Sequence, residues 1–286
     1  MSHFDYHRPD SLGDALQLKQ GLPDARWVAG GTDLLVKMKS GTASAGALIS
    51  LRGLNELRGI DTSGGGAVIG ALTPLSDVLA HPVVAERYPV LVRAIADIAS
   101  PQIRNAATLG GNFCNASPCA DTPPPLLVLE ARVRIEGPAG AREVPADAFF
   151  LGPGQTCLGP DEILAAVVLD PPRPGAVGAF LKKGRVRVDI ALVNVAVLVQ
   201  LEGGSFAHVR VAAGAVAPTP LRLRAVEELL EGQRATPELL VRADALAAES
   251  VAPITDVRAS AGYRRRITGV YVRRCLEQLC NEGSAG

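Results

Sequence analysis

The spacing of hydrophobic positions predicts alternating helices and strands in the first part of the chain. Between residues 88 and 100, Leu91, Ala94, Ile95 and Ile98 recur at three- and four-residue steps, which is typical of an amphipathic helix that Pro101 ends. Other runs predict a helix from residue 12, strands at residues 27–29, 47–51 and 67–71, a helical turn after residue 34 and a helix from residue 74. This part therefore mixes helices with short strands.

Later in the chain, strand patterns come first and helical patterns follow. Valine-rich runs predict strands at residues 132–135, 163–169, 176–181, 186–201 and 207–213. Helices are predicted at residues 221–231, 237–249 and 260–280, the second of them with Thr236 as its cap and Pro237 at its first position. Strands followed by helices favour an α+β C-terminal domain.

Two segments lack hydrophobic periodicity. Residues 106–125 are rich in Gly, Asn, Ser and Pro and predict a long loop of the kind that is often functional. Residues 170–175 combine prolines with a glycine and predict a linker. We therefore divide the chain into one domain at residues 1–175 and a second at residues 176–286.

Composition narrows the class of protein. A chain of 286 residues is long enough for two domains, and its 29 basic residues balance 29 acidic ones, which disfavours binding to nucleic acid or to an anionic membrane. The apolar stretch at residues 190–201 is shorter than the ~20 residues that span a bilayer. The N-terminus has no signal-peptide pattern, and five cysteines are an odd number, so we expect a cytoplasmic protein with reduced thiols.

Motif searches exclude several classes of site and leave two glycine pairs. The sequence has no G-x-G-x-x-G, P-loop, G-x-S-x-G or H-E-x-x-H pattern. Gly30-Gly31 and Gly110-Gly111 each follow an apolar stretch and have polar neighbours. Adjacent glycines let backbone N–H groups approach an anion such as a pyrophosphate, although a single pair is more often an ordinary turn.

These loops and several later motifs resemble one family, the FAD-binding or medium subunit of the molybdenum hydroxylases, which includes xanthine dehydrogenase and carbon monoxide dehydrogenase. The resemblance spans nearly the whole chain and is carried by A-G-G-T-D-L at residues 29–34, I-G-A at 69–71, I-R-N at 103–105, T-L-G-G-N at 108–112, A-S-P at 116–118 and A-D at 120–121. Weaker matches lie at residues 180–191, 217–220 and 260–264.

The resemblance implies a two-lobed FAD-binding domain of the p-cresol methylhydroxylase and vanillyl-alcohol oxidase type, followed by an α+β C-terminal flavoprotein domain. FAD would lie non-covalently between the lobes. The residues that the family pattern assigns to the cofactor are Val28, Ala29, Gly30, Gly31, Thr32, Asp33, Leu34, Thr108, Gly110, Gly111, Asn112, Ser117, Asp121, Ile163, Leu164 and Lys182, or Lys183 beside it. In this pattern backbone amides of both glycine loops hold the pyrophosphate, and Lys182 lies near the flavin edge.

The function implied by the resemblance is electron relay. The subunit would take electrons from a [2Fe-2S] centre in a small partner subunit and pass them to an acceptor such as NAD or a quinone, while a large partner subunit carries the molybdenum cofactor and sets the substrate. No residue of this chain is assigned to catalysis or to a metal. Two alternatives stay open: a stand-alone FAD-dependent oxidoreductase of the same fold, and a cofactor-free scaffold.

The cysteines and a run of arginines receive weaker interpretations. Cys114 and Cys119 flank the predicted cofactor loop, but an iron–sulfur cluster commonly takes four cysteine ligands, so we expect no cluster there. Arginines gather between residues 258 and 274, and without interleaved aromatic residues they indicate a solvated helix face or a subunit contact rather than a nucleic-acid site.

Overall fold

The N-terminal region forms a small parallel sheet. The computed structural model describes residues 3–186 and 188–283, and its first sheet has the order β1 (Asp5–His7), β3 (Ala47–Ser50), β2 (Arg26–Val28). Helix α1 (Leu12–Gly21) precedes β2, and the side chain of Ser11 caps its first turn. Helix α2 (Leu34–Lys39) begins directly after the first glycine pair.

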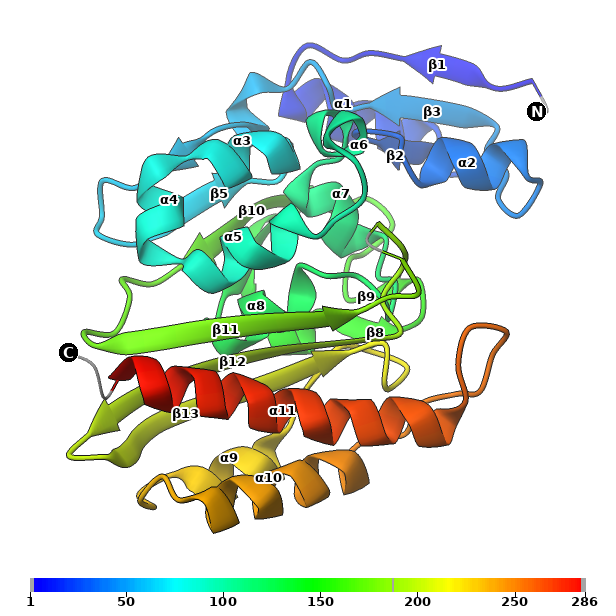
Figure 1. Cartoon of the computed structure of the whole chain (residues 1–286). Helices are drawn as coiled ribbons and strands as arrows, with labels where there is room; N and C mark the ends of the chain where they lie inside the picture. Colours follow the sequence, from blue (N-terminus) through cyan, green and yellow to red (C-terminus); the bar gives the residue numbers. More distant parts are fainter. Residues whose placement is uncertain (1–2, 187, 284–286) are drawn as a thin grey trace.

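A larger antiparallel sheet forms the second layer (Figure 1). Its order is β4 (Ile60–Asp61), β5 (Ala67–Gly70), β10 (Ile163–Leu169), β6 (Arg132–Gly137), β7 (Gly140–Pro145). The helices between β5 and β6 are α3 (Leu75–Ala80), α4 (Pro82–Arg87), α5 (Pro89–Ala96), α6 (Pro101–Ala106), α7 (Leu109–Cys114) and α8 (Pro123–Val128). A short hairpin, β8 (Phe150–Gly152) with β9 (Gln155–Thr156), and the 3-10 turns η1 (Asn55–Leu57) and η2 (Ala146–Ala148) complete this part.

The C-terminal region is an antiparallel sheet with helices on both faces. Its strands are β11 (Ala176–Lys183), β12 (Val193–Glu202), β13 (Ser205–Gly214) and β14 (Leu221–Arg222), in that order. Helices α9 (Arg224–Leu230), α10 (Pro237–Glu249) and the long α11 (Ala261–Gly283) cover one face, while α5 and α8 contact the other (Figure 1). The α+β class is confirmed.

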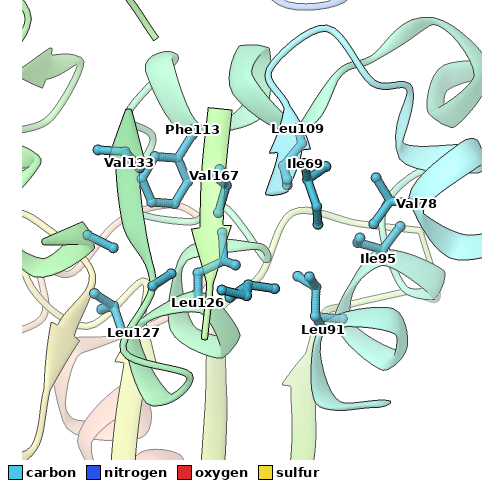
Figure 2. Close-up of a cluster of buried hydrophobic side chains, with 14 of the residues drawn as sticks. Ile69, Val78, Leu91, Ile95, Leu109, Phe113, Leu126, Leu127, Val133 and Val167 are labelled. Carbon is cyan, nitrogen blue, oxygen red and sulfur yellow. The ribbon is translucent and has the colours of Figure 1, made fainter. Parts of the chain in front are cut away.

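The main hydrophobic core lies between the second sheet and helices α3, α5, α7 and α8. Figure 2 shows Phe113, Val133 and Val167 at one end of this cluster and Val78 and Ile95 at the other. The core also includes side chains of the C-terminal sheet, namely Phe180, Ala196 and Ala212. The second sheet and the C-terminal sheet therefore share buried apolar surface.

Three predictions about local structure are wrong. Residues 106–125 are not one long loop, because α7 and α8 occupy much of the segment and Thr108 caps α7 by accepting from the Gly111 amide. The strand predicted at 186–201 begins only at Val193, since Asp189 folds the preceding residues into a turn by accepting from the Ile190 amide and from Arg185; Arg187 lies outside the described residues. The helix predicted at 221–231 begins at Arg224, after strand β14.

Among the described residues, no helix combines the length and apolarity that a bilayer span requires.

Candidate functional site

A cavity of about 690 Å³ lies where β2, the first glycine loop, α7 and the start of β10 meet. Its volume falls within the range of ~300–1,000 Å³ that is typical of small-molecule and cofactor sites. The predicted site residues on its wall are Val28, Ala29, Gly30, Gly31, Thr32, Asp33, Leu34, Thr108, Gly110, Gly111, Asn112, Ile163 and Leu164. The structure thus brings together residues from both glycine segments and from β10.

Two glycines in the first loop are required by its geometry. Gly31 has φ +75°, a left-handed conformation that disfavours side chains with a Cβ. A Cβ on Gly30 would lie 2.0 Å from the carbonyl oxygen of Ala106, so the loop and the end of α6 approach more closely than any other residue type allows. Gly30 therefore lets the first loop pack directly against the backbone that leads into the second glycine segment.

The first glycine loop has free backbone donors. Four of its carbonyls accept hydrogen bonds: Ala29 and Gly30 accept from the Arg52 guanidinium, Gly31 accepts from the Leu35 amide at 3.1 Å, and Asp33 accepts from the Lys37 amide. Its amides at residues 30–33, all within the described part of the chain, donate to no protein acceptor. Unpaired amides in a glycine-rich loop are the groups that an anion such as a pyrophosphate needs.

The second glycine segment differs from the first in its backbone hydrogen bonds. The amides of Leu109 and Gly110 donate to the carbonyls of Thr73 and Ala71 at 3.1 and 2.8 Å, and the Gly111 amide donates to Thr108 Oγ1. These amides already have protein acceptors, so of the two glycine segments only the first has a run of free amides. A Cβ on Gly110 would lie 2.5 Å from the Cβ of Ala71, which shows that this glycine serves close packing.

The third wall of the cavity is held by an ion pair. Glu162 lines the cavity and accepts from Arg142 through both carboxylate oxygens, at 2.8 and 2.7 Å, and from the Gly159 amide. Hydrogen bonds from Arg142 lower the pKa of Glu162 to about 2. Together these contacts fix the segment that leads into Ile163 and Leu164, whose side chains enter two different hydrophobic clusters.

Three predicted site residues do not line the cavity. Lys182 Nζ donates to Asp121 Oδ2 at 2.6 Å and to the carbonyl of Asp97 at 3.1 Å, and Asn194 donates to the other Asp121 oxygen. The side chains of Lys182 and Asp121 are only 6% and 8% exposed, and burial raises the pKa of Asp121. Ser117 accepts from the Cys119 amide in the neighbouring turn. Lys182 is therefore buried in an ion pair and does not line the cavity.

Sequence reasoning missed several polar residues of the cavity. Lys37 on α2 donates to Asn115 Oδ1 at 2.6 Å, and both residues line the cavity from opposite sides. Trp27 also lines it, and its Nε1 atom is buried without a hydrogen-bond partner. The position of Lys37 in the helix that follows the glycine pair was the available signal; nothing in the sequence marks Asn115.

The two cysteines near the predicted cofactor loop have different surroundings. Cys114 lines the cavity, and burial raises the pKa of its thiol to about 12. Cys119 lies beside Arg258, with its sulfur 3.9 Å from the guanidinium. Within the part of the chain that the structure describes, no three His, Cys, Asp or Glu side chains are grouped so that they could hold a metal ion.

Comparisons with known proteins agree with this geometry. Residues 2–172 match the model for the FAD binding domain in molybdopterin dehydrogenase, and residues 179–279 match the CO dehydrogenase flavoprotein C-terminal domain. The carbon monoxide dehydrogenase medium chain of Hydrogenophaga pseudoflava is 37% identical over 96% of each chain, and a putative xanthine dehydrogenase FAD-binding subunit of Escherichia coli is 34% identical over 96% of this chain and 94% of its own length.

Solved structures give the same result. A carbon monoxide dehydrogenase structure from Hydrogenophaga pseudoflava superposes with a TM-score of 0.94 at 38% identity, covering 96% of both chains. Quinoline 2-oxidoreductase from Pseudomonas putida superposes with a TM-score of 0.93 at 29% identity, covering 99% of this chain and 98% of its own. The resemblance inferred from the motifs is confirmed, and the chain belongs to the family of FAD-binding medium subunits of molybdenum-containing hydroxylases and dehydrogenases.

Proposed function

We propose that this chain binds FAD non-covalently in the 690 Å³ cavity, with the pyrophosphate against the first glycine loop. The observation that carries the proposal is the set of unpaired amides at residues 30–33 on the cavity wall. Lys37 lies on the same wall and adds a cation for the phosphate charge. Gly110 and Gly111 also line the cavity.

The buried ion pair of Asp121 and Lys182 does not belong to the proposed FAD site. Asp121 accepts from both Lys182 and Asn194, so contact with a cofactor would require a buried ion pair to separate. We therefore assign only the residues of the cavity wall to the cofactor site. Asp121 and Lys182 instead connect the turn before α8 to the C-terminal sheet. Ser117 belongs to that turn.

The proposed role is electron relay within a complex. A bound flavin supplies the capacity to accept electrons singly and to release them as a pair. The chain would take electrons from a [2Fe-2S] centre of a small partner subunit and deliver them to an acceptor such as NAD or a quinone. The name medium chain supports a small and a large partner subunit, and the molybdenum cofactor would lie in the large one, in keeping with a matched structure described as a Cu,Mo-CO dehydrogenase.

Two further parts of the proposal concern organisation and location. We place the boundary between the FAD-binding domain and the C-terminal domain at residue 175, within the segment between the two matched family models. We place the protein in the cytoplasm, supported by five cysteines that all remain free thiols.

The test is purification from the native host through a tag on this chain, followed by absorbance spectroscopy and mass spectrometry. The expected result is FAD together with an iron–sulfur subunit and a molybdenum subunit. FAD without partners under mild conditions would indicate a stand-alone flavoenzyme. A preparation without flavin that also fails to bind added FAD would refute the proposal.

A further inference from the structure

Arg52, a residue outside the cavity wall, holds the first glycine loop. It lies two residues after strand β3 and donates from Nε to the carbonyl of Ala29 at 3.1 Å and from Nη2 to the carbonyl of Gly30 at 2.8 Å. No family motif quoted above includes it. Its two contacts are to consecutive peptide groups of the loop that carries the free amides.

The geometry of the peptide bond connects those carbonyls to the free donors. In a planar trans peptide the carbonyl of one residue and the N–H of the next point in opposite directions. By holding the carbonyls of Ala29 and Gly30, Arg52 therefore directs the N–H groups of Gly30 and Gly31 away from itself. Those two N–H groups belong to the set that has no protein acceptor.

A glycine loop needs such a restraint more than other segments do. Glycine populates many backbone conformations, so the peptide between Gly30 and Gly31 can rotate and present its carbonyl instead of its N–H. A carbonyl oxygen facing a pyrophosphate would repel it. The guanidinium has rigid, forked donors that match two neighbouring acceptors, which makes it suited to prevent this rotation.

Arg52 also keeps its positive charge. No carboxylate in the described part of the chain lies within ion-pair distance of it, whereas the nearby Arg58 pairs with Asp77 at 3.0 Å. The loop therefore has an uncompensated cation directly behind it. That charge favours an anion on the loop's other side.

We propose that Arg52 is a positioning residue for the pyrophosphate of the cofactor. It orients the amides of Gly30 and Gly31 and adds positive charge, without itself lining the cavity. The inference rests on the proposed FAD site and adds to it the residue that organises that site before the cofactor binds.

The test compares Arg52→Gln, Arg52→Lys and the control Arg58→Gln as full-length apoproteins, titrated with FAD and with riboflavin. Arg52→Gln should weaken FAD binding at least tenfold, Arg52→Lys should weaken it less because it keeps the charge and one donor, and Arg58→Gln should leave it unchanged. Riboflavin lacks phosphate, so its affinity should be the same in all variants. The thermal midpoint of each apoprotein is measured alongside.

The outcomes separate this inference from the proposed function. If Arg52→Gln binds FAD as tightly as the unaltered chain, or if it loses riboflavin and FAD affinity equally, Arg52 has no positioning role, although the FAD site itself stands. A lower thermal midpoint with unchanged FAD affinity would make Arg52 a structural residue only. If the unaltered chain fails to bind FAD, the proposed function is wrong.

Discussion

The close approach of the two glycine segments gives the sharpest quantitative prediction. Changing Gly30→Ala places a Cβ 2.0 Å from the Ala106 carbonyl oxygen and 2.8 Å from its carbon. Both are backbone atoms, so no side-chain rotation relieves the contact. The loop and the end of α6 must separate by about 1.4 Å before the 2.0 Å approach becomes an ordinary contact of 3.4 Å, and overpacking of this kind costs about 2 kcal/mol.

The separation of the two segments should weaken FAD binding, because both segments line the same cavity. A loss of about 2 kcal/mol corresponds to about 30-fold weaker FAD binding. The assay is titration of the apoprotein with FAD, followed by flavin fluorescence. Gly46→Ala is the matched control, since it lies in the same N-terminal region with no atom within 4 Å of the added Cβ.

The control should bind FAD normally and melt at the same temperature. Equal FAD affinity for Gly30→Ala and Gly46→Ala would refute the view that contact between the two segments shapes the site. Equal losses in both variants would show instead that the N-terminal region tolerates no change, whether or not the added Cβ meets another atom.

Three other perturbations test the fold around the site. Asp121→Asn should destabilise the protein by about 3 kcal/mol in thermal or denaturant unfolding, because it leaves the Lys182 cation buried without a carboxylate; the double variant with Lys182→Met should recover part of the loss, and additive losses would contradict the pairing. Glu162 has its pKa lowered in the folded state, so its stabilisation is present above the ordinary carboxyl pKa of 4.5 and is lost as the pH falls toward about 2. Because the Arg142–Glu162 pair is partly exposed, Glu162→Gln should cost about 1 kcal/mol at pH 7 and almost nothing near pH 2, and a pH-independent difference would be inconsistent with the ion pair. Phe113→Ala should cost about 3–5 kcal/mol, since Phe113 is fully buried and its ring centre lies 4.6 Å from that of Phe150; a loss below 1 kcal/mol would show that the core relaxes around the gap.

The sequence was sufficient to predict most elements and the first glycine loop. Periodicity identified the helices capped by Ser11 and Thr236 and the buried strand β10, because these signals are local to the chain. The loop at residues 29–34 was identified by family motif, and the structure places it on the cavity wall with free amides.

The features that the sequence did not reveal have a common physical cause, which is pairing between distant residues. The amides of the second glycine segment are taken by carbonyls at residues 71 and 73, and Lys182 is neutralised by Asp121 across 61 positions of sequence. Neither partner can be identified from local spacing. Segment 106–125 looked irregular because its glycines and prolines are poor helix formers, yet Thr108 and the prolines at the start of α8 support short helices at their first turns.

The core that joins the second sheet to the C-terminal sheet has a consequence for how the protein unfolds. Phe180, Ala196 and Ala212 come from the region matched by the second family model but are buried in the cluster built mainly by the first. Removing the C-terminal region would expose that apolar surface and leave Asp121 without its lysine. The two matched regions should therefore melt in a single cooperative transition, and a fragment ending at residue 175 should aggregate rather than fold as an independent flavoprotein.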